Sequence, residues 1–282
     1  MTTFSDRTAI LLGEAGMEAL RRARVSVFGL GGVGAACAMD LARAGVGFLH
    51  VVDFDLVEES NLNRLYFAYR DSIGRPKTEV FAEAALSINP NLRIEAERVF
   101  FSGLDAADAV ARAHASDCGY YADCVDSLNP KAHLIAALRS SGLVFISSMG
   151  TAGRLDPTLL RVSGFGKVRG CPLARSLRGR LKKMGVDIDF PAVWSDETPV
   201  KPVPRPEVSP APASGPASGP ASGPATEADA DTNAEAEPDA AAPRGRVRMM
   251  QGSSPFVPQT AGHFMASWIV RQILATGYLP VN

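Results

Sequence analysis

Short apolar runs alternate with longer amphipathic stretches along the first half of the chain. The short runs are rich in valine, isoleucine and aromatic residues, which is typical of buried strands, and the longer stretches have helical spacing. Alternation at this spacing predicts right-handed crossovers, and so a doubly wound, mostly parallel, Rossmann-like α/β sheet. The expected strands are 25–28, 48–52, 93–99, 120–125 and 143–147, and the expected helices are 33–44, 76–88, 105–115 and 131–140.

The pattern becomes less regular after Gly150. We expect later strands at 159–162 and 188–194, a strongly basic helix at 172–184, and a patterned C-terminal extension over 252–279. Between residue 194 and residue 252 we expect neither a strand nor a helix.

Residues 203–243 have a composition unlike the rest of the chain. They contain three tandem Ala-Ser-Gly-Pro units, seven acidic residues, one basic residue and no aromatic residue. Such a segment buries too little apolar surface to offset the roughly 1–2 kcal/mol that ordering each backbone residue costs. We therefore predict a disordered Pro/Ala/Ser/Gly-rich acidic insertion at 203–243, within a single domain built from 1–202 and 244–282.

Overall composition excludes several classes of protein. Of the 282 residues, 46% are hydrophobic and 21% charged, which is typical of a globular domain. No apolar run is long enough for a membrane span, and the N-terminus has no signal-peptide pattern, so we expect no membrane association. The four cysteines form no C-x-x-C pair, which argues against a disulfide scaffold or a four-thiolate zinc site and favours a cytoplasmic location.

The first expected strand runs directly into a glycine-rich turn that fits G-x-G-x-x-G. Gly29 permits the tight turn, Gly31 and Gly32 let the backbone approach phosphate oxygens, and Gly34 lets the following helix pack closely. The helix N-terminus adds free N–H groups and partial positive charge. Asp53 ends the next expected strand, where a carboxylate accepts hydrogen bonds from ribose hydroxyls. These features predict an adenine-nucleotide site.

Two enzyme classes fit this turn: a nicotinamide dehydrogenase and an ATP-using adenylyltransferase. A dehydrogenase needs no extra cations beyond the ribose acid. Attack on the α-phosphate of ATP builds charge there and on pyrophosphate, so fixed cations and Mg²⁺ are needed. Arg64 offers a planar fork for phosphate oxygens and Lys77 a mobile charge, while Asp126 follows another strand at the same edge of the sheet. This set favours the adenylyltransferase, with a non-enzymatic nucleotide-binding module as a further alternative.

Four motifs in order, G-x-G-G-V-G, D-x-D-x-V-x-x-S-N-L-x-R, G-x-P-K and D-x-x-D-S, resemble those of the ubiquitin-activating-type (ThiF-like) adenylyltransferase superfamily. The resemblance implies one ATP-binding domain that adenylates a carboxylate with ATP and Mg²⁺, as a homodimer. It implies that Asp126 serves catalysis and the metal, together with the catalytic cations Arg64 and Lys77. The residues it implies for ATP are Gly29, Gly31, Gly32, Gly34, Asp53, Asp55, Asn61, Arg64, Lys77 and, reaching the partner subunit's triphosphate, Arg7.

The pattern beyond these motifs looks like one branch of the superfamily, the tRNA threonylcarbamoyladenosine dehydratases. The matches include Arg43-x-Gly45-Val46-Gly47, Gly150-x₂-Gly153-x₂-Asp156-Pro157-Thr158 and Cys171-Pro172-Leu173-Ala174-Arg175. The paired zinc cysteines typical of sulfur-carrier activators are missing. The resemblance implies ATP-dependent cyclisation, by dehydration, of threonylcarbamoyladenosine in tRNA through an acyl-adenylate. The alternative is adenylation of the C-terminus of a small sulfur-carrier or ubiquitin-like protein.

Two further features carry open alternatives. Residues 161–183 hold eight basic residues and no acid, which fits either contact with tRNA phosphates or a solvated helix face. Cys171 lies in this basic neighbourhood and is a candidate catalytic thiol, although it fits a structural role as well. The candidate nucleic-acid residues are Arg169, Arg175, Arg178, Arg180, Lys182 and Lys183.

Overall fold

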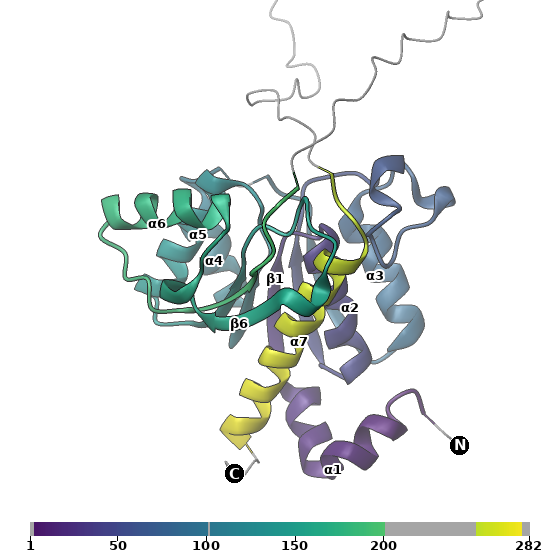
Figure 1. Ribbon diagram of the computed structural model, residues 1–282. Coiled ribbons are helices and arrows are strands. Elements are labelled where there is room, and N and C mark those ends of the chain that lie inside the picture. The colour runs from purple at the N-terminus through teal and green to yellow at the C-terminus, as the bar shows by residue number, and fades with distance from the viewer. Residues whose placement is uncertain (1–2, 101, 201–251, 278–282) are drawn as a thin grey trace, which may run out of the picture. The chain divides into compact units, whose positions relative to one another are not determined.

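The structure, a computed structural model, describes residues 3–100, 102–200 and 252–277, and the predicted insertion at 203–243 lies outside the described residues. Seven strands form one sheet in the order β3-β2-β1-β4-β5-β7-β6 (Figure 1). All neighbours are parallel except β6 and β7, which confirms the predicted α/β class. The strands are β1 (Arg24–Phe28), β2 (Phe48–Val52), β3 (Arg93–Glu97), β4 (Tyr120–Asp123), β5 (Val144–Ser148), β6 (Leu160–Gly164) and β7 (Pro191–Ser195).

Helices cover both faces of the sheet, and each face has its own apolar core. One core joins α1, α2, α3 and α7 to inward-facing residues such as Val27 and Val51. The other joins α4, α5 and α6 to Phe28, Tyr121 and Phe145. The helices are α1 (Asp6–Arg22), α2 (Gly32–Ala44), α3 (Lys77–Ile88), α4 (Ala106–Ala115), α5 (Leu128–Ser140), α6 (Pro172–Lys183) and α7 (Phe256–Gly277). No helix of the described residues is both long and apolar enough to cross a membrane.

The first helix was not expected from the sequence. A kink interrupts α1 at Gly13, where φ is 69° and ψ is 172°. Its C-terminal half buries Met17 and Leu20, whereas Ile10 and Leu11 before the kink are 86% and 80% exposed. Ala9 and Leu12, also before the kink, are partly buried against the same core, so both halves contribute to it.

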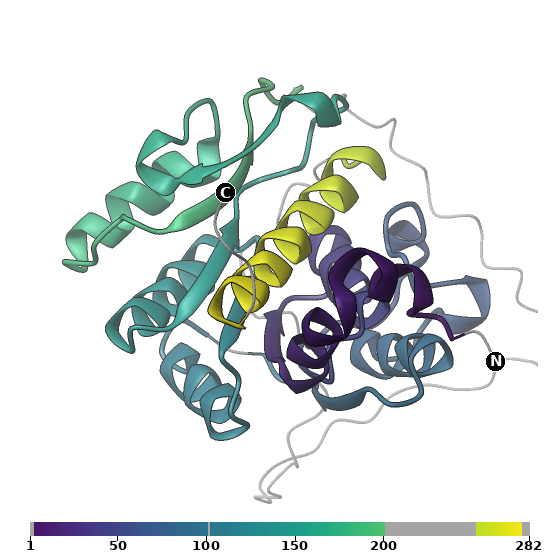
Figure 2. The same ribbon diagram turned by 90° about the horizontal axis from the view of Figure 1, so that it is seen from below.

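The last helix packs across the start of the helix that follows the glycine turn. Figure 2 shows α7 lying alongside α1, and it crosses α2 at Gly262. A methyl group at Gly262 would collide with the Val33 carbonyl oxygen and lie 2.7 Å from Ala36 Cβ and 2.8 Å from Cys37 N. Glycine is required here because the two helix backbones approach too closely for any side chain. This contact positions the first turn of α2.

The fourth strand ends earlier than the sequence indicated. Residues 120–125 were expected to be extended up to Asp126, but β4 ends at Asp123. The chain leaves the sheet there because the Asp123 carboxylate accepts a hydrogen bond from Val125 N at 3.1 Å, forming a local turn. Cys124 N still donates to Phe28 O at 2.9 Å, so this turn stays beside the end of β1.

Candidate functional site

The glycine-rich turn links β1 to α2 at the carboxyl edge of the sheet. Gly29 has a φ of 89°, a conformation that favours glycine. A methyl group at Gly34 would overlap the Gly29 carbonyl oxygen and lie 3.1 Å from Cys124 Cβ. At Gly31, by contrast, a methyl group would meet nothing within 4 Å. The turn is thus closely packed at Gly34 and leaves space at Gly31. The first N–H groups of α2 have no partners within the helix and are suited to binding an anion.

Asp53 fixes the turn from the neighbouring strand. Asp53 is 9% exposed, and its carboxylate accepts hydrogen bonds from Leu30 N at 2.5 Å and Asp55 N at 2.8 Å. Burial raises the pKa of the Asp53 carboxyl, an effect that the nearby Lys77 charge and the two backbone donors oppose. The sequence thus places an acid at the end of β2 that is already bonded to the glycine turn.

Lys77 begins α3 and faces these carboxylates. Its Nζ lies 2.6 Å from Asp55 Oδ2 and 4.0 Å from Asp53 Oδ1, and only 5% of the residue is exposed. Its backbone N–H donates to Asp55 O at 3.1 Å, and Pro76 forms a bridge with Leu56. These contacts hold the ammonium group beside Asp53, the candidate ribose-binding residue, and away from bulk solvent.

Arg64 packs directly against the turn. A methyl group at Gly32 would lie 3.3 Å from both Cγ and Cδ of Arg64. The guanidinium donates to Ser60 O at 2.8 Å and to Asn63 Oδ1 at 2.9 Å, which leaves further N–H groups for a ligand. Asn61 is 8% exposed in the short 3-10 helix just before it. This segment therefore places the Arg64 side chain against the first turn of α2, whereas the Asn61 amide is hydrogen-bonded to Glu58 N and Ser60 Oγ, both at 3.3 Å.

Two aspartates, one at the end of β4 and one in the turn that follows, lie in opposite environments. Asp123 is fully buried, 2.8 Å from Lys131 Nζ, and it accepts a hydrogen bond from Ser147 Oγ at 2.6 Å. Lys131 also donates to Val125 O at 2.8 Å, so it holds the backbone just before Asp126. Asp126 itself is exposed. The buried pair was missed from the sequence, although a lysine on the following helix was a visible signal.

The glycine turn adjoins Arg64, is linked to Lys77 through Asp53, and borders the backbone that precedes Asp126. A methyl group at Gly29 would lie 3.2 Å from Cys124 O and 3.5 Å from Val125 N, the residue before Asp126. Arg64 contacts the same turn, and Lys77 reaches it through Asp53. Arg7 differs, because it lies exposed on α1 and makes no contact with the turn among the described residues.

The side chains at this edge of the sheet determine whether a divalent metal ion fits there. Among the described residues, no three His, Cys, Asp or Glu side chains surround a common point. Mg²⁺ is usually held by one or two carboxylates together with substrate phosphates. Asp123 pairs with Lys131, and the exposed Asp126, whose Oδ1 accepts a hydrogen bond from Ser127 Oγ at 3.3 Å, directly follows the backbone that adjoins Gly29. The donor set thus fits a Mg²⁺ that arrives with a nucleotide.

The structure divides the basic residues of 161–183 into two groups. Arg169 forms a bidentate pair with Asp196, with both N–O distances 2.9 Å. Arg178 donates to Val168 O at 2.8 Å, and Arg180 donates to Asn129. These three side chains already have protein partners. Arg180 is nevertheless exposed on α6, as are Arg175, Lys182 and Lys183.

Cys171 caps the N-terminus of α6. Its Sγ accepts a hydrogen bond from Ala174 N at 3.5 Å, and the residue is 4% exposed. A methyl group at Gly150 would lie 3.5 Å from this sulfur. The thiol thus has a clear structural position near the end of β5, and its catalytic role stays a prediction.

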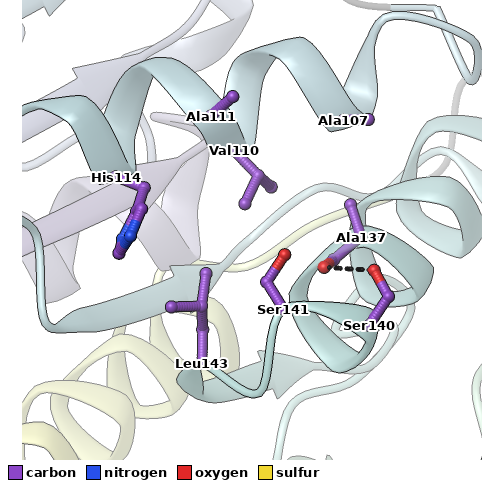
Figure 3. Close-up of a pocket in the computed structure, with 8 residues that line it drawn as sticks. All are labelled: Ala107, Val110, Ala111, His114, Ala137, Ser140, Ser141 and Leu143. Carbon is purple, nitrogen blue, oxygen red and sulfur yellow. Dashed lines mark hydrogen bonds between the residues drawn. The ribbon is translucent and has the colours of Figure 1, made fainter.

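Two cavities lie elsewhere in the described residues. The first, of about 210 Å³, lies between α4 and α5 and is lined by small side chains, with His114 at one end (Figure 3). The second, of about 520 Å³, is bordered by α1, α7 and the start of β4. Neither includes a residue of the glycine turn or its charged neighbours.

Comparison with known proteins agrees with this geometry. The sequence matches the ThiF family over residues 5–277. It is 37% identical over 194 residues to the tRNA threonylcarbamoyladenosine dehydratase of Escherichia coli K12, covering 65% of this chain and 71% of the relative. The Bacillus subtilis enzyme of the same name is 31% identical, with 69% and 75% covered. The crystal structure of the E. coli dehydratase in complex with ATP superposes with a TM-score of 0.75 at 27% identity, covering 96% of this chain and 94% of that one.

Proposed function

The chain belongs to the ThiF family, and from this membership and the site geometry we propose that it is an ATP-dependent tRNA threonylcarbamoyladenosine dehydratase. The observation that carries the proposal is the convergence of Arg64, Lys77 and the turn before Asp126 on the glycine turn. The likeness to dehydratases of two bacteria, and to one with ATP bound, supports the same activity.

The proposed chemistry begins with the carboxylate of the threonylcarbamoyl group. A carboxylate is a poor electrophile because oxide would have to leave. One carboxylate oxygen attacks the α-phosphorus of ATP, pyrophosphate leaves, and a mixed anhydride with AMP forms. Fixed cations stabilise the charge that builds on the α-phosphate and the leaving pyrophosphate. Arg64, which packs on Gly32, and Lys77, which lies beside Asp53, supply these cations.

Ring closure follows without another cofactor. A nitrogen or oxygen of the same substituent attacks the activated acyl carbon, and AMP departs with the original carboxylate oxygen. The substituent has then lost one water, and ATP has become AMP and pyrophosphate. Holding both reacting groups in one site supplies a large effective concentration. This scheme needs no cysteine, so a buried, helix-capping Cys171 is compatible with it.

Individual residues receive roles in this scheme. The backbone of Gly29–Gly34 binds phosphate, with no side chain in the way at Gly31, and Asp53 binds the ribose beside Asp55. Asn61 joins the two cations in binding phosphate oxygens. Asp126 would hold Mg²⁺, which supplies charge neutralisation on the phosphates when bound.

The substrate RNA is proposed to lie along α6. This helix starts beside the end of β5, and its Arg180 contacts Asn129 just beyond the Asp126 turn. An RNA backbone on the exposed cations of α6 would thus run toward the adenylation site. Since the substrate is tRNA, we also propose that the protein acts in the cytoplasm.

A homodimer is part of the proposal. Arg7 is exposed on the same part of α1 as Ile10 and Leu11, whose apolar side chains point away from the described core. Burying them against a second copy would remove this apolar surface from water and place Arg7 near the partner's triphosphate. Light scattering measures the mass, and a monomer would contradict this part.

The direct test is a nucleoside mass assay. The protein is incubated with ATP and threonylcarbamoylated tRNA, which is then digested to nucleosides. We expect AMP formation and a nucleoside lighter by one water. Arg64→Ala or Lys77→Ala should lower the rate on the order of 10²-fold or more, as removal of one charge stabiliser does elsewhere. Arg75→Ala is the matched control, because this neighbouring cation pairs with Glu83 on the surface.

The same assay separates the alternative function. An activator of a small carrier protein would exchange pyrophosphate into ATP when given a carrier with a C-terminal carboxylate, without tRNA. Unchanged tRNA mass together with carrier-dependent exchange would replace the dehydratase proposal. Exchange that requires the modified tRNA would support it.

A further inference from the structure

Two cysteines and a methionine pack in the core behind the glycine turn. Cys124 follows β4, and its Sγ donates to Met265 Sδ of α7 at 3.8 Å. Cys37 is buried on α2, and Cys124 is the main neighbour that raises the pKa of its thiol. Cys37 lies one helical turn after Gly34, where a methyl group would be 3.1 Å from Cys124 Cβ, so Cys124 packs against this face of α2. The two thiols are therefore neighbours that bridge β4 and α2.

We propose that Cys37 and Cys124 are a redox-sensitive pair whose disulfide distorts the phosphate-binding turn. The oxidant is hydrogen peroxide or a related peroxide. Cys124 thiol reduces one peroxide to water and becomes a sulfenic acid. The Cys37 thiol then attacks that sulfur, a second water leaves, and the S–S bond forms. Overall, the two thiols lose two protons and two electrons to the peroxide.

The surroundings fix the order of these steps. Cys37 is fully buried, whereas Cys124 is partly exposed at the edge of the sheet. The hydrogen bond with Cys124, burial and the charge of Asp40 all raise the pKa of the Cys37 thiol. A buried thiol that resists ionisation reacts slowly with a dissolved oxidant. Cys124 thus meets the peroxide first, and Cys37 resolves the product.

Disulfide formation has a direct path to the turn. The two sulfur atoms must approach to the covalent S–S distance of about 2.05 Å. Cys124 Cβ already lies against the Gly34 backbone, and the Cys124 carbonyl lies against Gly29, so this movement presses β4 onto the first turn of α2. Displacing one N–H donor from a phosphate would weaken ATP binding by roughly tenfold or more.

The experiment treats the full-length protein with hydrogen peroxide and measures two quantities. Peptide mass spectrometry should find a Cys37–Cys124 linked pair that dithiothreitol removes. Calorimetry should show ATP binding weakened by roughly tenfold or more after oxidation, and restored by dithiothreitol. Cys37→Ala should keep its ATP affinity under the same treatment, and Cys37→Ser serves if the alanine variant does not fold. Cys118→Ala is the control, because this buried cysteine lies in the other core and should leave the sensitivity intact.

Several outcomes would overturn the inference. One is the absence of the linked peptide in oxidised native protein. Another is equal loss of ATP affinity in Cys37→Ala and native protein, which would assign the effect to another oxidised group. A linked peptide without any change in affinity would remove the regulatory part. The inference rests on the proposed nucleotide site, and absent ATP binding in reduced protein would instead contradict that proposed function.

Discussion

Lys131 Nζ and Asp123 Oδ2 are 2.8 Å apart in an ion pair in which neither side chain is exposed. The same ammonium group donates to Val125 O, so the pair ties the end of β4 to the turn that carries Asp126. Breaking a buried pair on one side leaves an uncompensated charge. We expect Lys131→Met to lower the free energy of unfolding by about 3–5 kcal/mol, measured by urea denaturation.

The control for this variant is an exposed ion pair of similar chemistry. Arg75 and Glu83 are 41% and 63% exposed at their side chains, so Arg75→Met should cost about 0–1 kcal/mol. Equal losses in the two variants would show that the buried pair does not hold the Asp126 turn.

Gly31 and Gly34 of the turn should respond differently to alanine. Gly34→Ala places a methyl group on the Gly29 carbonyl oxygen, so the backbone must shift, and we expect a loss of about 1–3 kcal/mol. Gly31→Ala meets nothing within 4 Å and should leave the unfolding free energy nearly unchanged. Thermal unfolding measures both, and an equally stable Gly34→Ala protein would contradict the packing described for this turn.

The pair of His263 and Asp40 should make stability depend on pH. The hydrogen bond to Asp40 raises the pKa of His263 above its ordinary 6.5, against the effect of burial. A raised histidine pKa gives stability that is complete below the unfolded value and is lost as pH rises through the folded value. Since the two side chains are 38% and 34% exposed, the effect is about 0.2–1 kcal/mol.

Melting temperatures between about pH 5.5 and 8.5 test this dependence, since histidine titrates in that range. Native protein should lose its advantage over Asp40→Asn as pH rises, while the Tyr66 ring packed on His263 stays in both. A constant difference across the range would argue against titration of His263.

The cations of 161–183 should contribute unequally to RNA binding. Replacing Lys182 and Lys183 by glutamine should weaken tRNA binding and lower the salt slope by about 1 for each lost phosphate contact. Arg169→Gln is the matched control, because Asp196 already holds that guanidinium. Filter binding at several salt concentrations measures the slopes, and equal effects of the two changes would contradict this division.

The predicted insertion at 203–243 can be tested by deletion. Val200 N donates to Gly153 O at 2.7 Å, and Gly153 N donates to Gly252 O at 2.8 Å. The backbone of Gly153 therefore binds the chain both before and after residues 203–243. A shorter connection costs less closure entropy, about 0.6 kcal/mol per halving of its length. Deleting 206–242 should therefore keep or slightly raise the melting temperature and keep dehydratase activity. A large drop would show that the segment is structural.

Much of the sheet was predictable because it is built from buried parallel strands. Strand 48–52 was predicted with the bounds that β2 has, 25–28 begins one residue later than β1, and 143–147 is shifted from β5 by one residue at both ends. Their nearly continuous burial leaves short apolar runs that are recognisable in the sequence. Helix α1 was not predicted, since it is interrupted at Gly13 and exposes Ile10 and Leu11.

The site was predictable as a set of residue types but not as a network. A glycine motif followed by an acid, an arginine and a lysine indicates phosphate chemistry in sequence alone. The Asp123–Lys131 pair and the separation of Arg169 from Lys182 depend on side-chain contacts across elements, which no local pattern encodes. The sequence placed Asp126 at the end of a strand, whereas a turn stabilised by Asp123 intervenes.

The crossing of α7 over α2 has a consequence for synthesis on the ribosome. The first turn of α2 touches Pro258 and Gly262, which are translated more than two hundred residues after it. The nascent chain carries the glycine motif long before the helix that braces it has emerged. A fragment stopped before α7 would expose the apolar face of α2 to chaperones, and nucleotide binding would begin only after α7 has been translated.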